Sequence, residues 1–223
     1  MLFLDELPEF DRKVLEVLRQ PLESKEIVIS RAARQMTFPA NFQFIAAMNP
    51  CPCGYAFNQD SRCQCSPESI QRYQNRISGP LLDRIDLHID VPPLQANELQ
   101  ERTPSENSET VRQRVMKAYQ QQIQRQQCLN QALSPTLLEQ YACLDDSSSK
   151  IIEMAQQRLN LSARAYHRVL RVARTIADLA ESEIISSSHL TEALSDRGHS
   201  TKKKKKKKAT LEVALIFIVI RKR

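Results

Sequence analysis

Apolar runs that end abruptly in polar residues mark the first part of the chain as strands of a buried sheet. Residues 2–5 (LFLD) form one such run, and residues 41–50 (NFQFIAAMNP) contain a second. Residues 85–91 alternate apolar and polar positions, as a strand does, before two prolines close the run. Between the first two runs, residues 26–40 predict two strands joined as a hairpin.

Helical periodicity separates these strands and then dominates the chain. Residues 11–22 carry an apolar stripe at i, i+3, i+4 spacing, with Pro21 straining its last turn. Ser66 and Pro67 have the N-cap and first-turn chemistry of a second helix, which Gly79-Pro80 should end. Beyond residue 94 the pattern predicts helices near 105–127, 135–142, 148–159, 162–182 and 187–195.

These patterns divide the chain into three parts. We predict an α/β core over residues 1–93, an all-α domain over residues 94–196, and a tail over residues 197–223. The tail contains seven consecutive lysines and then an apolar stretch with no amphipathic pattern to dock it. We therefore expect the tail to be basic and disordered.

Charge and composition change this picture little. The net charge of +6 is misleading, because residues 197–223 carry +10 and residues 1–196 therefore carry −4. The longest apolar run, residues 213–220, is far shorter than the roughly 18 residues that a membrane-spanning helix needs. Six cysteines without an N-terminal apolar signal region favour a reducing compartment. We expect a cytoplasmic protein with no membrane partner.

Two of the predicted strands end in groups suited to phosphoryl transfer. Asp5 and Glu6 follow the first strand, and such a pair can hold Mg²⁺ with one carboxylate and polarise a water molecule with the other. Asn49 ends the second long strand, where its amide can orient the same water. The alternatives are an acidic strand end that feeds a loop, and an Asn that starts a turn before Pro50.

Four cysteines lie close together in the sequence, in a C-x-C, nine-residue, C-x-C arrangement. Four thiolates on one short loop can bind tetrahedral zinc, although one-residue spacing is tighter than is usual for zinc ligands. The alternative is a set of buried free thiols that merely pack. The candidate zinc ligands are Cys51, Cys53, Cys63 and Cys65.

Four segments, in order and at matching spacing, resemble the magnesium-chelatase-like AAA+ proteins of the ComM/YifB type. They are LFLDELPEF, AAMNPCPCGY, SGPLLDRIDLHI and LSARAYHRVLRVARTIADLA, and the resemblance covers about residues 1–195. It implies a partial AAA+ P-loop NTPase core from the Walker B strand onward, followed by a helical lid. It also implies a hexameric ring of identical or full-length homologous subunits that hydrolyses ATP with Mg²⁺. In this type the motor drives DNA branch migration during natural transformation.

The resemblance assigns roles to named residues in the core. Asp5 and Glu6 match the Walker B pair, with Asp5 on the Mg²⁺ ion, and Asn49 matches sensor 1. Arg84 matches the arginine finger that reaches the γ-phosphate of a neighbouring subunit. Its alternative role is an ion pair with Asp83 or Asp86.

Further arginines are candidates for contacts with phosphate. In the lid, Arg164 matches sensor 2 and Arg168 is the second candidate, whereas we expect the rest of that basic stripe to be a solvated helix face. Arg31 and Arg34 lie where this clade inserts a hairpin whose tip can grip DNA phosphates. A solvated turn is an equal alternative for the tip.

The sequence contains three glycines and no G-x-x-x-x-G-K-[ST], so it lacks the Walker A loop of the family. We expect a C-terminal fragment that is inactive alone, and a tail from about residue 199 that arises from slippage on an A-rich tract. A tail that binds nucleic acid is the alternative. For the chain, the alternatives are a chelatase motor subunit for metal insertion, a ring-joining or dominant-negative subunit, and an inert product of a broken gene.

Overall fold

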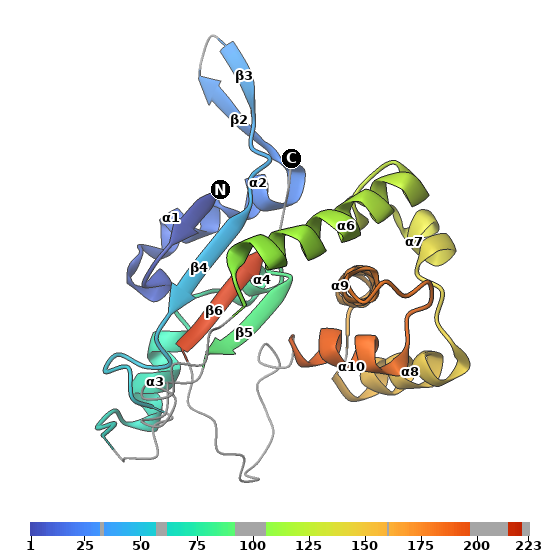
Figure 1. Cartoon of the computed structure of the whole chain (residues 1–223). Helices are drawn as coiled ribbons and strands as arrows, with labels where there is room; N and C mark the ends of the chain where they lie inside the picture. Colours follow the sequence, from blue (N-terminus) through green and yellow to red (C-terminus); the bar gives the residue numbers. More distant parts are fainter. Residues whose placement is uncertain (32–33, 57–61, 92–105, 160, 197–213, 220–223) are drawn as a thin grey trace. The chain divides into compact units, whose positions relative to one another are not determined.

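The structure is a computed structural model that describes residues 1–31, 34–56, 62–91, 106–159, 161–196 and 214–219. The described residues form two units (Figure 1). The first contains the residues up to Val91 together with 214–219, and the second contains residues 106–196. No helix within these ranges is long and apolar enough to cross a membrane.

A four-stranded sheet lies at the centre of the first unit. Its strands are β1 (Leu2–Leu4), β4 (Phe44–Met48), β6 (Ala214–Val219) and β5 (Leu87–Val91), in that spatial order. β1 pairs with β4 in parallel, and β6 is antiparallel to both β4 and β5. Consequently β1, β4 and β5 all run in one direction, and β6 alone opposes them.

The position of β6 corrects the prediction of a wholly disordered tail. Residues 214–219 pair along their length with β4 on one side and β5 on the other, for example Ile216 with Ala47 and with Ile89. Their sequence, ALIFIV, is rich in β-branched and aromatic residues, which favour strands. A strand between two others also satisfies its backbone groups on both edges. Residues 197–213 and 220–223, the remainder of that prediction, lie outside the described residues.

Short helices pack against this sheet. The predicted helix over residues 11–22 is divided into α1 (Arg12–Val17) and α2 (Arg19–Ser24), because Pro21 lacks the N–H that would continue the ladder. α3 (Pro67–Gln74) begins at the predicted cap, where the Ser66 side chain accepts from the Ser69 N–H at 3.2 Å. The prediction that Gly79-Pro80 ends this helix was wrong, because these residues begin a short helix, α4 (Gly79–Leu82). The core beneath them includes Leu7, Leu15, Leu22, Phe44, Ala46 and Leu81.

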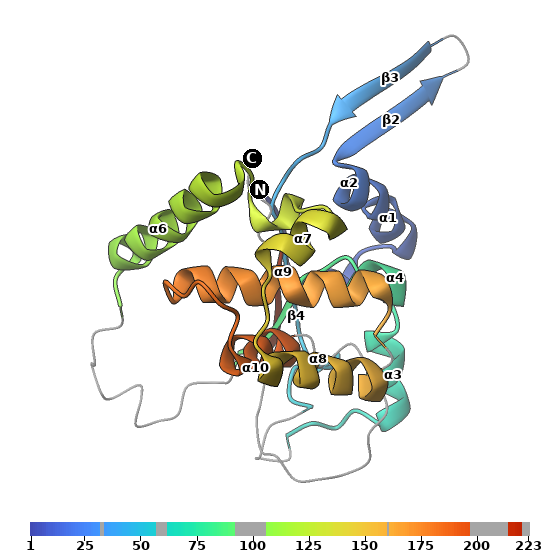
Figure 2. The same cartoon turned by 90° about the vertical axis from the view of Figure 1, so that its right-hand side faces the viewer.

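The predicted hairpin is confirmed as β2 (Glu26–Arg31) and β3 (Arg34–Pro39). Its strands are antiparallel, and Arg31 and Arg34 are partners at its far end. Every described residue of both strands is exposed. Figures 1 and 2 show this ribbon projecting away from the sheet of its own unit.

The second unit confirms the predicted helices. They are α6 (Ser108–Gln126), α7 (Pro135–Tyr141), α8 (Asp146–Leu159), α9 (Ala163–Leu179) and α10 (Ser187–Ser195), with a short η2 (Asn130–Ala132). α9 packs against α6, α7 and α10, and the apolar side chains of Val169, Ala173 and Ala177 on it are fully buried. Ser134 and Ser162 cap α7 and α9 by accepting from the backbone.

Candidate functional site

The sheet brings the three polar strand-end residues to one edge. β1 and β4 are adjacent and parallel, with Leu4 opposite Ala46, so their carboxyl ends lie side by side. Asp5 and Glu6 follow β1, Asn49 follows β4, and all three are exposed. The ends of parallel strands are where ligands bind in open α/β sheets. This edge therefore carries two carboxylates and an amide at neighbouring strand ends.

The backbone at Glu6 is held in an unusual conformation. Its φ of 50° and ψ of 46° place a non-glycine residue in the left-handed region. The Glu6 N–H donates to the Asp5 carboxylate at 2.9 Å, which fixes the two acids relative to each other. Such strained residues cluster at functional sites. No pattern in the sequence predicts this backbone conformation.

Arg84 belongs to the same unit but is held by its own helices. Its Nε donates to the Arg19 carbonyl at 3.1 Å and its Nη1 to the Pro80 carbonyl at 2.6 Å. Its Nη2 forms an ion pair with the Glu23 carboxylate, and the side chain is only 13% exposed. The sequence reasoning considered Asp83 and Asp86 as partners and missed Glu23, which is 61 positions away.

The arginines of α9 lie in the second unit and differ in environment. Arg164 is exposed, whereas Arg168 is 9% exposed. Arg171 donates to the Leu133 carbonyl at 2.7 Å, and Arg174 is only 1% exposed. The expectation of a solvated face was therefore wrong for Arg174. Its guanidinium donates hydrogen bonds to the Asp178 carboxylate and to two backbone carbonyls of the turn after α9, in place of water.

The hairpin has one apolar face that also carries its two arginines. Because side chains alternate along a strand, β2 residues 27, 29 and 31 share a face with their partners 38, 36 and 34. Apart from the arginine pair, this face is formed by Ile27, Ile29, Met36 and Phe38, which are 39–55% exposed. The opposite face is largely polar. The alternation of residues in 26–31 and 34–39 is the sequence signal for this face.

The four cysteine thiols converge on one point. Cys51 Sγ lies 3.3 Å from Cys53 Sγ and 3.8 Å from Cys63 Sγ, and Cys53 Sγ lies 3.5 Å from Cys63 Sγ. All four Sγ atoms, that of Cys65 included, lie within 4.8 Å of one another. These thiols are free, since a disulfide needs about 2.05 Å. The cluster can bind zinc.

The protonation of these thiols is uneven. A hydrogen bond from the Tyr55 backbone, followed by one from the Cys51 thiol, lowers the pKa of Cys53 to about 6. The Cys65 backbone stabilises the Cys63 thiolate, but burial and the neighbouring thiols outweigh it and raise the pKa of Cys63 to about 12. Near neutral pH this favours a thiolate at Cys53 and a protonated thiol at Cys63. A cation is needed to hold all four as thiolates.

The cysteine loop joins the end of β4 to the start of α3, and α3 contacts the segment around Asn49. The Tyr73 hydroxyl forms a hydrogen bond with the Asn49 backbone. Burial, and then the charge of Glu9, raises the pKa of Tyr73. Gln74 Nε2 donates to the Pro50 carbonyl at 3.0 Å. Sequence reasoning missed both residues, because only the fold brings α3 beside this strand end.

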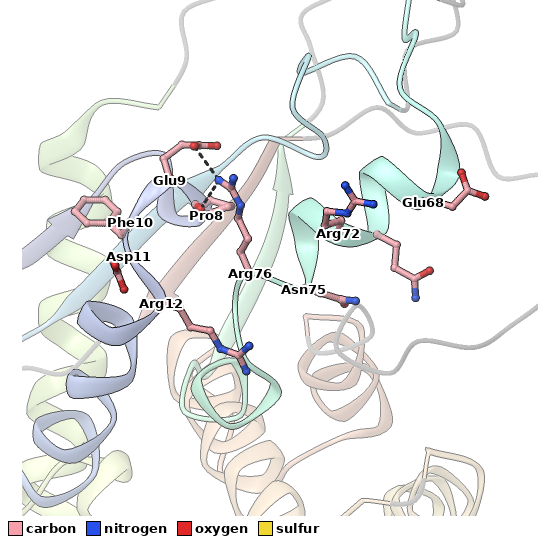
Figure 3. Close-up of a pocket in the computed structure, with 10 residues that line it drawn as sticks. Pro8, Glu9, Phe10, Asp11, Arg12, Glu68, Arg72, Asn75 and Arg76 are labelled. Atoms are coloured by element: carbon pink, nitrogen blue, oxygen red, sulfur yellow. Dashed lines mark hydrogen bonds and ion pairs between the residues drawn. The ribbon is translucent and has the colours of Figure 1, made fainter.

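An open pocket of about 860 Å³ lies between η1 (Leu7–Glu9), α1 and α3 (Figure 3). Arg76 reaches across it to the Pro8 carbonyl at 3.0 Å and the Glu9 carboxylate at 2.9 Å. Arginines and acids line it in equal number, so it has no net charge to attract an ion. Among its described lining residues there is no strand-end acid, Asn49 or Arg84. The pocket is thus distinct from the predicted site.

Comparison with known sequences defines the class of protein. The family described as "Magnesium chelatase, subunit ChlI" matches residues 1–99, and "Magnesium chelatase, subunit ChlI C-terminal" matches residues 105–197. Together these matches span most of the chain. The chain belongs to the magnesium chelatase ChlI-like family.

The chain is also similar to individual proteins over most of its length. The chain is 50% identical to "Competence protein ComM" of Haemophilus influenzae, with 88% of the chain and 38% of that protein aligned. It is 46% identical to "Uncharacterized protein YifB" of Escherichia coli, with 88% and 39% aligned. An uncharacterized protein of Mycobacterium bovis is 37% identical, with 88% and 39% aligned. The chain therefore spans less than two fifths of the length of these relatives.

Proposed function

We propose that this chain is part of an ATP-hydrolysing AAA+ motor subunit that works in a cytoplasmic hexameric ring and moves DNA. The observation that carries the proposal is the shared sheet edge of Asp5, Glu6 and Asn49. Family membership supports ATP and Mg²⁺ as ligands of this edge. The name of the Haemophilus relative, a competence protein, supports DNA as the substrate of the whole motor.

Each strand-end residue has a distinct task in this proposal. Asp5 holds the magnesium ion, which when bound offsets the negative charge of the phosphate oxygens. Glu6 accepts a hydrogen bond from the attacking water and orients it toward the γ-phosphate, and the Asn49 amide holds that water from the neighbouring strand. Arg84 would reach the γ-phosphate of an adjacent subunit only after leaving Glu23. Arg164, with Arg168 as the second candidate, would contact phosphate from the helical unit.

We further propose that this chain alone does not hydrolyse ATP. Its sequence contains no Gly-Lys-Ser/Thr phosphate loop, so the backbone amides and the lysine that hold the β- and γ-phosphates are lacking. The activity would belong to a longer protein that carries this segment after such a loop.

Glu6→Gln in a longer protein of this kind tests the role of the sheet edge. The amide keeps the shape of Glu6 but cannot polarise water, so we expect kcat for ATP to fall at least about 100-fold while ATP binding is retained. Steady-state phosphate release and binding of a fluorescent ATP analogue measure the two effects. Glu9→Gln, at an exposed acid three residues along, is the matched control and should retain activity.

An unchanged kcat in the Glu6→Gln protein would contradict the assignment. For the chain by itself, Mg²⁺-dependent ATPase activity that survives repeated purification and is lost in Glu6→Gln would contradict the proposal of inactivity.

The family description also favours a second function, a motor subunit that drives metal insertion as a chelatase does. Stimulation of the ATPase by DNA distinguishes the two, because a chelatase motor has no reason to respond to it.

A further inference from the structure

We propose that Cys51, Cys53, Cys63 and Cys65 bind one zinc ion, and that this metal positions Asn49 at the edge of the sheet. The second part rests on the proposed function, since it concerns the same Asn49. The first part stands on the geometry of the thiols alone.

The separations of the thiols match the metal. A tetrahedral Zn²⁺ with bonds of about 2.3 Å to sulfur places its ligands about 3.8 Å apart. The Sγ–Sγ distances among Cys51, Cys53 and Cys63 are 3.3, 3.5 and 3.8 Å. These distances are close to the edge length of that tetrahedron, about 3.8 Å, and they are far too long for a disulfide bond. Four sulfurs also give the complete ligand set of a structural zinc site, with no position left open for water.

Burial and the surrounding residues suit a structural site. Cys51 is fully buried, whereas Cys53 is exposed, so the cluster lies at the protein surface with one ligand anchored in the interior. The Arg62 guanidinium lies 5.6 Å from the centre of the Tyr55 ring, a contact that joins the two halves of the loop.

The position of the cluster in the chain explains what the metal would fix. Cys51 follows Asn49 by two residues, and Cys65 immediately precedes Ser66, the cap of α3. A metal bound to both holds the end of β4 next to the beginning of α3. From α3, Tyr73 and Gln74 then bond to Asn49 and Pro50. The zinc would therefore set the position of Asn49 indirectly, as a positioning site and not a catalytic one.

Metal analysis of the purified full chain tests the site. We expect about one zinc per chain in the wild type, and less than about 0.2 in the Cys53→Ser, Cys65→Ser variant. Cys128→Ser with Cys143→Ser is the matched control, because these cysteines lie in the second unit, and it should keep about one zinc. Replacement with Co²⁺ should give the visible absorption of a tetrahedral thiolate site. Less than about 0.5 zinc per chain in the wild type, after expression with added zinc, overturns the proposal.

Hydrogen exchange of the same chain, without nucleotide, tests positioning. Removing zinc from the wild type with a chelator should speed amide exchange at residues 49–51 and 66–70 at least about tenfold, and leave α9 unchanged. In the variant that lacks Cys53 and Cys65, the same chelator treatment should not change the rate of amide exchange at these residues. Metal loss without faster exchange at these residues overturns the positioning role. Neither the zinc content nor the amide exchange depends on ATP. A failure of the motor proposal would appear in the ATPase measurements and leave these two results unchanged.

Discussion

The arginines of α9 show how strongly the environment of one residue decides its role. Arg164 and Arg174 have the same side chain on the same helix, yet the first is exposed and the second is 1% exposed. Arg174 donates to the Asp178 carboxylate at 3.0 Å, and Asp178 also accepts from Arg125 at 2.6 Å. Asn130 completes the set by donating to Asp178 at 2.8 Å. Burial lowers the pKa of Arg174, and the charge of Asp178 opposes this.

Removing the buried arginine should damage the second unit. Arg174→Ala leaves a cavity, two turn carbonyls without their donor and Asp178 with only part of its compensation, so we expect the free energy of unfolding to fall by about 3 kcal/mol. Arg164→Ala, on the exposed side of the same helix, should change it by less than about 0.5 kcal/mol. Urea unfolding followed by circular dichroism measures both. Equal stabilities for the two variants would show that the network around Asp178 contributes nothing.

At the scale of single residues, the sequence predicted positions better than partners. Asp5, Glu6 and Asn49 could be placed at strand ends because each follows an apolar run, and the parallel pairing of β1 with β4 brings those ends to one edge. Glu23 could not be found as the partner of Arg84, nor Tyr73 as the partner of Asn49. Those contacts depend on helix packing between segments far apart in the chain, which periodicity does not encode. The left-handed backbone of Glu6 likewise has no sequence signal, since such conformations favour glycine or asparagine.

Among the elements, the capped helices followed their local signals, whereas α4 and the final strand did not. Caps such as Ser66, Ser134 and Ser162 lie where the sequence placed helix starts, because a capping bond is made within four residues. β6 depends instead on the position between β4 and β5, which no local pattern reveals. For this reason the local pattern does not predict that an apolar stretch after a run of lysines packs into a sheet.

A proline in β6 tests whether this strand supports the sheet. Ile216→Pro removes a backbone donor and disfavours strand pairing at the centre of β6. In the sheet, residue 216 pairs with Ala47 of β4 and with Ile89 of β5. We expect amide exchange across residues 44–48 and 87–91 to become at least about tenfold faster. Ile216→Val retains the strand conformation and is the control. If the proline variant protects β4 and β5 as well as the wild type does, β6 is dispensable for the sheet.

At the scale of the whole molecule, two basic features of the chain differ in character. Residues 197–223 carry +10, mostly in one lysine run, whereas residues 1–196 carry −4. The hairpin brings Arg31 and Arg34 together as cross-strand partners, beside an exposed apolar face. Like charges placed opposite each other destabilise a strand pair unless an anion lies between them. If DNA is the ligand, phosphates would supply that anion, and bases would cover the apolar face, as they do on known single-strand binding surfaces.

Salt dependence of DNA binding separates these two contributions. Arg31→Ala with Arg34→Ala should weaken binding of a fluorescent single-stranded oligonucleotide and reduce the slope of log K against log salt by about 1.4, the value for two phosphate contacts. Replacing Lys202–Lys208 with glutamine should reduce the slope by up to about 5. Arg112→Ala with Arg158→Ala removes two exposed charges elsewhere and controls for net charge. Because the lysines attract any polyanion, the hairpin effect should be clearest in the glutamine background. If the arginine pair leaves affinity and slope unchanged there, the hairpin does not grip DNA in this chain.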